Sequence, residues 1–138
     1  MSPNPSESRT VPAYDAVVEL HARYADTLDR KDVAGLAACF APDAVLVVGE
    51  QVAAEGGRTI AERLTSRSDP AVLHIPFPPA VCGVEGSRLR TRSYFQLVDT
   101  RTGRITALGT YEDEMTSTDQ AVVLTRRSVT YAWKEATP

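Results

Sequence analysis

The sequence predicts a single α+β domain in which helices come first and a long antiparallel sheet follows. Apolar residues between positions 17 and 40 recur at helical spacing, whereas residues 72–134 read as four strand-like runs separated by turn signals. Consecutive hairpins of this kind form a meander, and the helices then pack on one face of a strongly curved sheet. The four runs are residues 72–85, 87–99, 103–116 and 120–134.

The first helix is predicted from an apolar stripe. Its members follow one another at intervals of three and four residues, at Val17, Leu20, His21, Tyr24, Ala25 and Leu28. Asp29 follows Tyr24 by five residues, which places it about 140° further round the helix, at the flank of the stripe. Asp32 is placed to cap a second helix over residues 33–40 and so has a structural role, whereas the pattern gives Asp29 none.

Shorter elements complete the first half of the chain. Residues 44–48 and 51–55 are predicted to form a hairpin around Gly49, and a third helix is expected over residues 58–66. Residues 1–11, rich in Pro and Ser, are predicted to be a disordered tail, which leaves residues 12–138 as the folded domain.

The first β run is unusual because three prolines follow His74. A proline cannot donate a hydrogen bond to a neighbouring strand, so we expect a break or bend within residues 73–79. Before that break, His74 alternates with Val72 and Pro76 on one face of the strand.

The composition argues against several kinds of partner and cofactor. The formal net charge is −3, with 15 basic and 18 acidic side chains intermingled, so we expect neither a nucleic-acid nor a membrane partner. No signal peptide is recognised, and a cytoplasmic protein is expected. Cys39 and Cys82 lack metal-ligand spacing, so both are interpreted as reduced packing residues and no metal is expected. We expect no cofactor, because the chain has no phosphate-binding glycine loop and no dinucleotide fingerprint.

A family resemblance begins in the first helix. The pattern Tyr24-x4-Asp29-x2-Asp32, followed by Leu36, Phe40, Asp43, Ala44 and Val45, resembles the opening of SnoaL-like proteins in the nuclear-transport-factor-2-like superfamily. The resemblance covers residues 12–134 and implies a cone-shaped sheet wrapped around the long helix, the fold also called cystatin-like. Scytalone dehydratase, bile acid 7α-dehydratase, the dehydrochlorinase of hexachlorocyclohexane and ketosteroid isomerase belong to the same superfamily.

The resemblance also implies site residues. In the dehydratases and the dehydrochlorinase, the catalytic Asp and His match Asp29 and His74. In bile acid 7α-dehydratase and scytalone dehydratase, tyrosines near the position of Tyr24 serve the reacting oxygen. For Tyr24 the sequence leaves two interpretations open, a catalytic hydroxyl or a core residue. The segment Val122-x-Leu124-x2-Arg127 is similar to the family's aromatic-x-Ile-x2-Arg signature, and either Arg127 or Arg126 then faces the pocket. The substrate-binding residues expected are Arg127, Tyr111, Phe77 and Phe40.

These residues suggest a cofactor-independent lyase or isomerase: a dehydratase, double-bond isomerase or cyclase that acts on a hydrophobic polycyclic or polyketide-like molecule. We expect Asp29 and His74 to face one enclosed, mainly apolar cavity, with His74 moving a proton and Asp29 orienting it. The alternatives are an aldol cyclase with Asp29 as the base, and a non-catalytic ligand-binding module. The resemblance further implies a homodimer or higher homo-oligomer. The substrate and the choice among elimination, isomerisation and cyclisation stay open.

Overall fold

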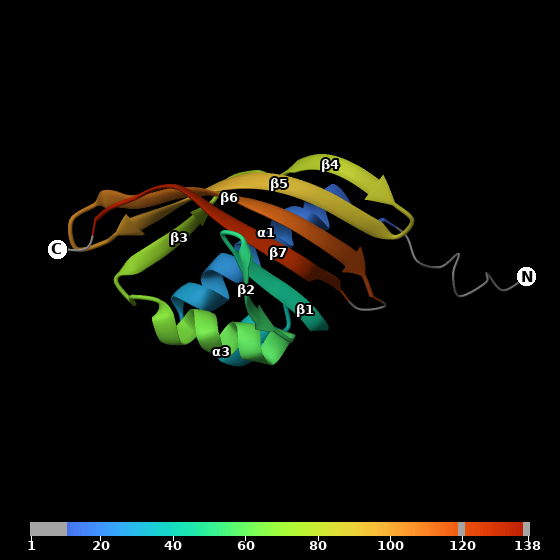
Figure 1. Ribbon diagram of the computed structural model, residues 1–138, viewed down its shortest axis with the longest axis horizontal. Helices are drawn as coiled ribbons and strands as arrows, with labels where there is room; N and C mark the ends of the chain where they lie inside the picture. Colours follow the sequence, from blue (N-terminus) through green and yellow to red (C-terminus); the bar gives the residue numbers. More distant parts are fainter. Residues whose placement is uncertain (1–10, 119–120, 137–138) are drawn as a thin grey trace, which may run out of the picture.

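The computed structural model describes residues 11–118 and 121–136, and within them a seven-stranded sheet curves over three helices (Figure 1). The strand order is β2-β1-β7-β6-β5-β3, with β4 paired to the remaining part of β5. The sheet is strongly bent but not closed. The three helices are α1 (Tyr14–Asp29), α2 (Val33–Ala37) and α3 (Gly57–Arg67). Its strands are β1 (Phe40–Val48), β2 (Gln51–Glu55), β3 (Val72–Pro76), β4 (Ala80–Glu85), β5 (Arg88–Asp99), β6 (Arg104–Ser117) and β7 (Val122–Lys134).

The α+β fold predicted from the sequence is confirmed, including the order of helices and strands. The predicted tail, residues 1–11, lies outside the described residues except for Val11, and the turn predicted around residue 119 also falls partly outside them. None of the described helices is long and apolar enough to cross a membrane.

Helix α1 buries the predicted stripe on the concave side of the sheet. Val17, Leu20, Tyr24 and Leu28 are each at most 3% exposed, and they pack against β5, β6 and β7 as part of one core. The Asp32 carboxylate accepts a hydrogen bond of 3.0 Å from the backbone N of Gly35, as expected of a helix cap.

The predicted end of the second helix was wrong. We expected it to reach Phe40, but α2 ends at Ala37 and Phe40 is the first residue of β1. The cause is pairing with a distant strand: the backbone N of Leu124 donates to the carbonyl of Cys39 at 2.8 Å, and Phe40 pairs with Leu124. β1 and β7 are parallel strands far apart in the sequence, so the residues around Phe40 alone do not predict this pairing.

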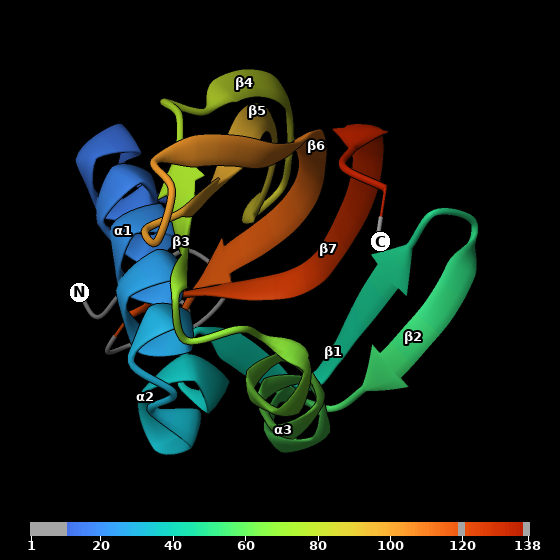
Figure 2. The same ribbon diagram turned by 90° about the vertical axis from the view of Figure 1, so that its left-hand side faces the viewer.

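The prolines after His74 break the first β run as predicted. β3 pairs with the second half of β5, from Phe95 to Asp99, and β4 pairs with its first half, from Arg88 to Arg92. Residues 77–79 therefore bridge two strands that share one partner. This leaves β3 free to turn toward α1 (Figure 2).

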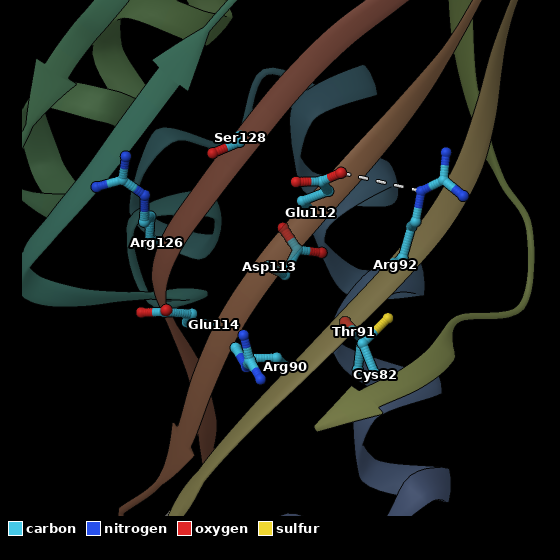
Figure 3. A pocket seen from close by; sticks show the side chains of 9 residues that line it. All are labelled: Cys82, Arg90, Thr91, Arg92, Glu112, Asp113, Glu114, Arg126 and Ser128. Carbon is cyan, nitrogen blue, oxygen red and sulfur yellow. Dashed lines mark ion pairs between the residues drawn. The ribbon is translucent and has the colours of Figure 1, made fainter. Parts of the chain in front are cut away.

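Buried and exposed residues alternate along the first part of β5. Leu89 and Phe95 are buried under α1, whereas Arg88, Arg90, Arg92 and Tyr94 are exposed on the convex side. On that side Arg90, Arg92 and Arg126 lie near Glu112 and Glu114 (Figure 3). One cysteine interpretation needs correction: Cys39 is buried, but Cys82 is exposed because β4 is an outer strand that no helix covers.

Candidate active site

The end of α1 and the middle of β3 bring Asp29 and His74 into direct contact. His74 Nδ1 lies 2.7 Å from Asp29 Oδ1, and the backbone N of His74 also donates to both carboxylate oxygens at 3.2 Å. Since a carboxylate only accepts, the ring must carry its proton on Nδ1. Within the part of the chain that the structure describes, no residue forms a hydrogen bond with His74 Nε2. The imidazole is thus held by one nitrogen and free at the other.

His74 lines a cleft of about 290 Å³, which we call the His74 cleft. Apolar walls come from Leu28 of α1, Leu64 of α3 and Leu97 of β5. The other lining residues are Arg67, Ser68, Asp69, Val72, Thr106, Tyr131 and Lys134. The expectation of an enclosed cavity was wrong, because the sheet does not close over the opening. The lining is mainly apolar as expected, and polar side chains are added from the end of α3 and from β7.

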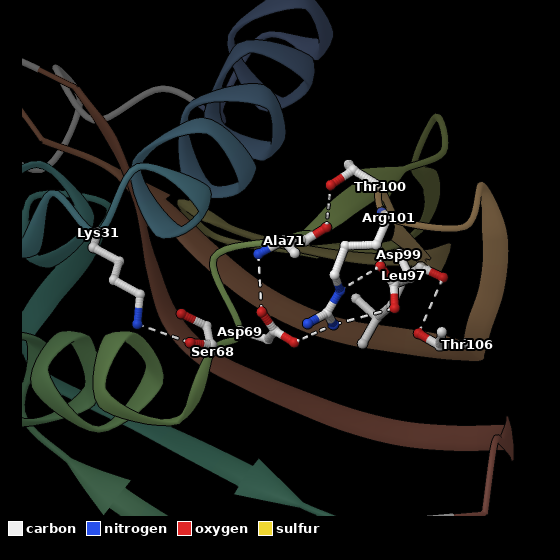
Figure 4. Close-up of polar contacts among 9 residues, drawn as sticks. All are labelled: Lys31, Ser68, Asp69, Ala71, Leu97, Asp99, Thr100, Arg101 and Thr106. Carbon is white, nitrogen blue, oxygen red and sulfur yellow. Dashed lines mark hydrogen bonds and ion pairs between the residues drawn. The ribbon is translucent and has the colours of Figure 1, made fainter.

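Polar contacts fix the rim of this cleft (Figure 4). Arg101 donates to Asp69 at 2.6 Å and to Asp99 at 3.0 Å, which ties the segment before β3 to the turn between β5 and β6. Lys31 Nζ donates to the carbonyl oxygens of Thr65 and Ser68 at 2.9 and 2.8 Å, which joins the turn after α1 to the end of α3. These bonds hold in place the segment that leads into His74.

The sequence reasoning missed Tyr131, one of several further polar side chains in the His74 cleft. Its ring packs edge-on against Phe95 at 5.7 Å between centroids, and Lys134 Nζ lies 5.0 Å from the ring centroid. Burial raises the pKa of the Tyr131 phenol, so it stays protonated and can donate a hydrogen bond. Arg127, Val129 and Tyr131 alternate along β7 and so share one face of the strand, which is the signal in the sequence that could have identified Tyr131.

Arg127 lies in the core, so of the neighbouring residues Arg126 and Arg127 it is Arg127 that faces inward. It is 1% exposed and donates to Asp113 through Nε at 2.8 Å and Nη2 at 2.9 Å, while Arg126 faces the convex side. The guanidinium carbon sits 3.7 Å from the Tyr111 ring centroid and 4.2 Å from that of Tyr24. Burial opposes its charge, but the Asp113 carboxylate outweighs burial and raises the pKa of Arg127 above its ordinary value. Sequence reasoning missed Asp113, although it alternates with the inward-facing Tyr111.

The predicted site residues therefore fall into three groups. Asp29 and His74 are in direct contact, but of the two only His74 lines the His74 cleft. Tyr24, Tyr111, Phe40 and Arg127 are packed together in the core, with the Tyr24 ring 6.0 Å from both the Phe40 and Tyr111 rings, and none of the four lines that cleft. Phe77 is 40% exposed and borders other clefts.

His21 belongs to the core group. Arg127 Nη2 lies 3.3 Å from His21 Nδ1, and because arginine only donates, Nδ1 accepts and the ring proton sits on Nε2. Burial, together with the adjacent Arg127 charge, lowers the pKa of His21 to about 4 against the partial opposition of Asp113. The ring is neutral near pH 7, so its 3.7 Å approach to Asp113 is not an ion pair.

The sequence-family model of the SnoaL-like domain matches residues 9–128 of this chain. The chain belongs to the SnoaL-like family. No curated protein matches it.

Solved structures agree on the fold of this SnoaL-like domain. A Nostoc punctiforme protein of unknown function with a cystatin-like fold superposes with a TM-score of 0.76 at 20% identity, over 88% of this chain and 94% of that one. A Novosphingobium aromaticivorans protein with the provisional name scytalone dehydratase gives 0.76 at 18% identity, over 90% and 87% of the two chains. ActVI-ORFA from Streptomyces coelicolor gives 0.75 at 19% identity, over 86% and 96%. These superpositions show a shared cystatin-like fold, the one that nuclear-transport-factor-2-like proteins have.

Titration of His21 should make the stability of this SnoaL-like domain depend on pH. Between pH 6.5 and about 4 the unfolded chain binds a proton that the folded ring does not, so the free energy of unfolding should fall as pH is lowered. The slope from this group is about 1.4 kcal/mol per pH unit, and its contribution is complete above pH 6.5. Urea denaturation of the wild type and of His21→Gln between pH 4 and 6.5 isolates the contribution of His21 to the free energy of unfolding. Identical slopes for the two proteins would show that His21 does not titrate in this way.

Proposed function

We propose that this SnoaL-like protein is a cofactor-independent lyase or isomerase that uses His74 as its proton carrier. The observation that supports this most is the 2.7 Å contact between His74 Nδ1 and Asp29, which leaves Nε2 as the basic nitrogen in a cleft with apolar walls. An imidazole oriented by a carboxylate is suited to take and return a proton near neutral pH.

In the proposed reaction, His74 Nε2 removes a proton from a carbon next to a carbonyl. The electron pair of that C–H bond moves into an enolate, whose oxygen accepts a hydrogen bond from the Tyr131 phenol. Asp29 stabilises the imidazolium that forms. The imidazolium then returns the proton, either to a hydroxyl that leaves as water or to another carbon of the substrate. The first route is an elimination and the second is a double-bond isomerisation.

The substrate that fits the His74 cleft best is a hydrophobic ring compound with a carbonyl group, of the polycyclic or polyketide kind. Leu28, Leu64 and Leu97 offer apolar walls, and polar residues gather at the rim. His74 is favoured over Asp29 as the base because the carboxylate already accepts hydrogen bonds from both the ring and the backbone of His74. An aldol cyclase with Asp29 as base would need these bonds to break first.

Deuterium exchange tests the proposed proton transfer before the natural substrate is known. Cyclic β-hydroxyketones and β,γ-unsaturated ketones, incubated with the protein in D₂O, should gain deuterium at the carbon next to the carbonyl faster than in buffer alone. Mass spectrometry measures the gain. A non-catalytic ligand-binding module would bind such compounds without any enzyme-dependent exchange, and exchange that persists in His74→Gln would reject His74 as the base.

We propose that two copies pair through the convex face of β5, β6 and β7. None of the described helices covers that face, which carries both arginines and glutamates, and Arg92 and Glu112 lie 3.9 Å apart within one chain (Figure 3). A face with both signs of charge can pair with a second copy of itself. Light scattering at micromolar concentration should give twice the chain mass of 15.0 kDa. The double reversal Arg90→Glu/Arg92→Glu should lower it to one chain, while Arg58→Glu on α3 should not. A monomeric wild type contradicts the proposal.

A further inference from the structure

Two basic side chains, Arg67 at the end of α3 and Lys134 at the end of β7, line the opening of the His74 cleft. Among the described residues, no carboxylate forms an ion pair with either of them. Of the described residues that line the cleft, Asp69 alone carries a carboxylate, and it already accepts from Arg101 at 2.6 Å and from the backbone N of Ala71 at 2.9 Å. The opening therefore carries two cations without an acidic partner.

The usual structural role of Arg67 is filled by another residue. A basic residue in the last turn of a helix ordinarily binds the last carbonyl oxygens, which have no partner within the helix. Here Lys31 Nζ donates to the carbonyl oxygens of Thr65 and Ser68 at 2.9 and 2.8 Å (Figure 4). The Arg67 guanidinium donates to no described residue, so its N–H groups are available to a ligand in the cleft.

Lys134 is placed beside the phenol that we propose as the donor to the enolate. Its Nζ lies 5.0 Å from the centroid of the Tyr131 ring, a distance at which the ring attracts the ammonium. Glu135, the next residue along the chain, is paired with Arg104 at 2.9 Å and does not neutralise Lys134. The ammonium thus keeps both its charge and its hydrogen-bond donors for a ligand.

We propose that the substrate carries a carboxylate in addition to its carbonyl group, and that Arg67 and Lys134 bind this carboxylate at the opening of the His74 cleft. A carboxylate offers one negative charge and two acceptor oxygens, one for each cation. The rings lie against the apolar walls further in, and a cleft of about 290 Å³ has room for two rings, since a cavity of about 150 Å³ holds benzene. This carboxylate site rests on the function proposed for His74, because both concern one substrate in one cleft.

Two probes of the same shape test the carboxylate site by binding, without turnover. 2-Naphthoate carries the carboxylate, naphthalene-2-carboxamide lacks the charge, and neither has an acidic carbon for His74 to deprotonate. Calorimetric titration of the full chain should give a dissociation constant about tenfold lower for the acid than for the amide. Raising NaCl from about 50 to about 500 mM should reduce this preference, because salt screens exposed charges. Bound 2-naphthoate should shift the ¹⁵N signals of the His74 ring.

A pair of double variants assigns the preference for the acid to the two cations. Arg67→Gln/Lys134→Gln should bind the acid and the amide about equally. Arg58→Gln/Arg126→Gln loses the same charge at residues that do not line the cleft and should keep the tenfold preference. The proposal is overturned if the wild type binds both probes equally, if the first variant keeps the preference, or if 2-naphthoate shifts the signals of His21 and not those of His74.

The carboxylate site and the proposed reaction can fail separately. Deuterium exchange into cyclic ketones, combined with equal binding of 2-naphthoate and its amide, would retain His74 as the base and overturn the carboxylate site. A preference for the acid that disappears in Arg67→Gln/Lys134→Gln, without any enzyme-dependent exchange, would support the carboxylate site and overturn the reaction.

Discussion

His74→Gln should lower kcat by about 10²–10⁴ on any substrate found by deuterium exchange, the usual scale for loss of a general acid–base group. Glutamine keeps a polar side chain of similar length but cannot take up a proton. Asp29→Asn should cost a comparable factor, because the neutral amide does not balance the imidazolium charge and its NH₂ group cannot accept the hydrogen bond that the second carboxylate oxygen takes from the His74 backbone N. The double variant should lose much less than the product of the two factors, since both changes disable one unit.

Asp26→Asn is the matched control for this prediction. Asp26 is on the same helix, one turn before Asp29, and its side chain is 60% exposed and paired with Arg30 at 2.8 Å. Its loss should leave kcat unchanged. Full activity in folded His74→Gln together with an inactive Asp29→Asn would make Asp29 the base. Full activity in both folded variants would remove both residues from the mechanism.

The second large effect concerns stability. Arg127→Met should lower the free energy of unfolding by about 3–5 kcal/mol, because it leaves the Asp113 carboxylate buried without its charged partner. Both members of this pair are at most 2% exposed, so solvent cannot compensate. The Tyr24 and Tyr111 rings would also lose the cation between them. Urea denaturation monitored by circular dichroism gives the difference.

Replacing both charges at once separates the ion pair from simple packing. Arg127→Met/Asp113→Leu should be clearly more stable than Arg127→Met alone, since no unpaired charge remains in the core. Arg126→Met, one residue away on the convex face, should change stability by less than about 0.5 kcal/mol. A double variant less stable than Arg127→Met would show that packing around Arg127, and not the charge left on Asp113, determines the cost.

Much of the fold could be predicted from local patterns because these patterns have local causes. The apolar stripe of α1, the Asp32 cap and the alternation along β5 each depend on neighbouring residues only. The end of α2 could not be predicted in this way, since Phe40 is drawn into the sheet by Leu124, a residue more than eighty positions later. The half-open shape of the His74 cleft likewise depends on residues far apart in the sequence, because the ends of α3 and β7 both line it.

The candidate site was accessible to sequence reasoning only in part. The pattern placed Asp29 beside the buried stripe of α1, and the family resemblance supplied its pairing with His74, which the fold then brings to 2.7 Å. Tyr131 and Asp113 were missed because each sits among exposed or charged neighbours in the sequence. Strand alternation, continued from Arg127 and from Tyr111, is the signal that identifies both as inward-facing.

The proton on the His74 ring provides the most direct test of the proposed mechanism, and it requires no substrate. The chain has two histidines, so a ¹⁵N correlation spectrum of the imidazole rings at pH 8 should contain two sets of signals, which His21→Gln assigns. We predict opposite tautomers: His74 with its proton on Nδ1, bonded to Asp29, and His21 with its proton on Nε2. A His74 ring protonated on Nε2 would contradict the account, because the nitrogen proposed as the base would then have no lone pair to take a proton.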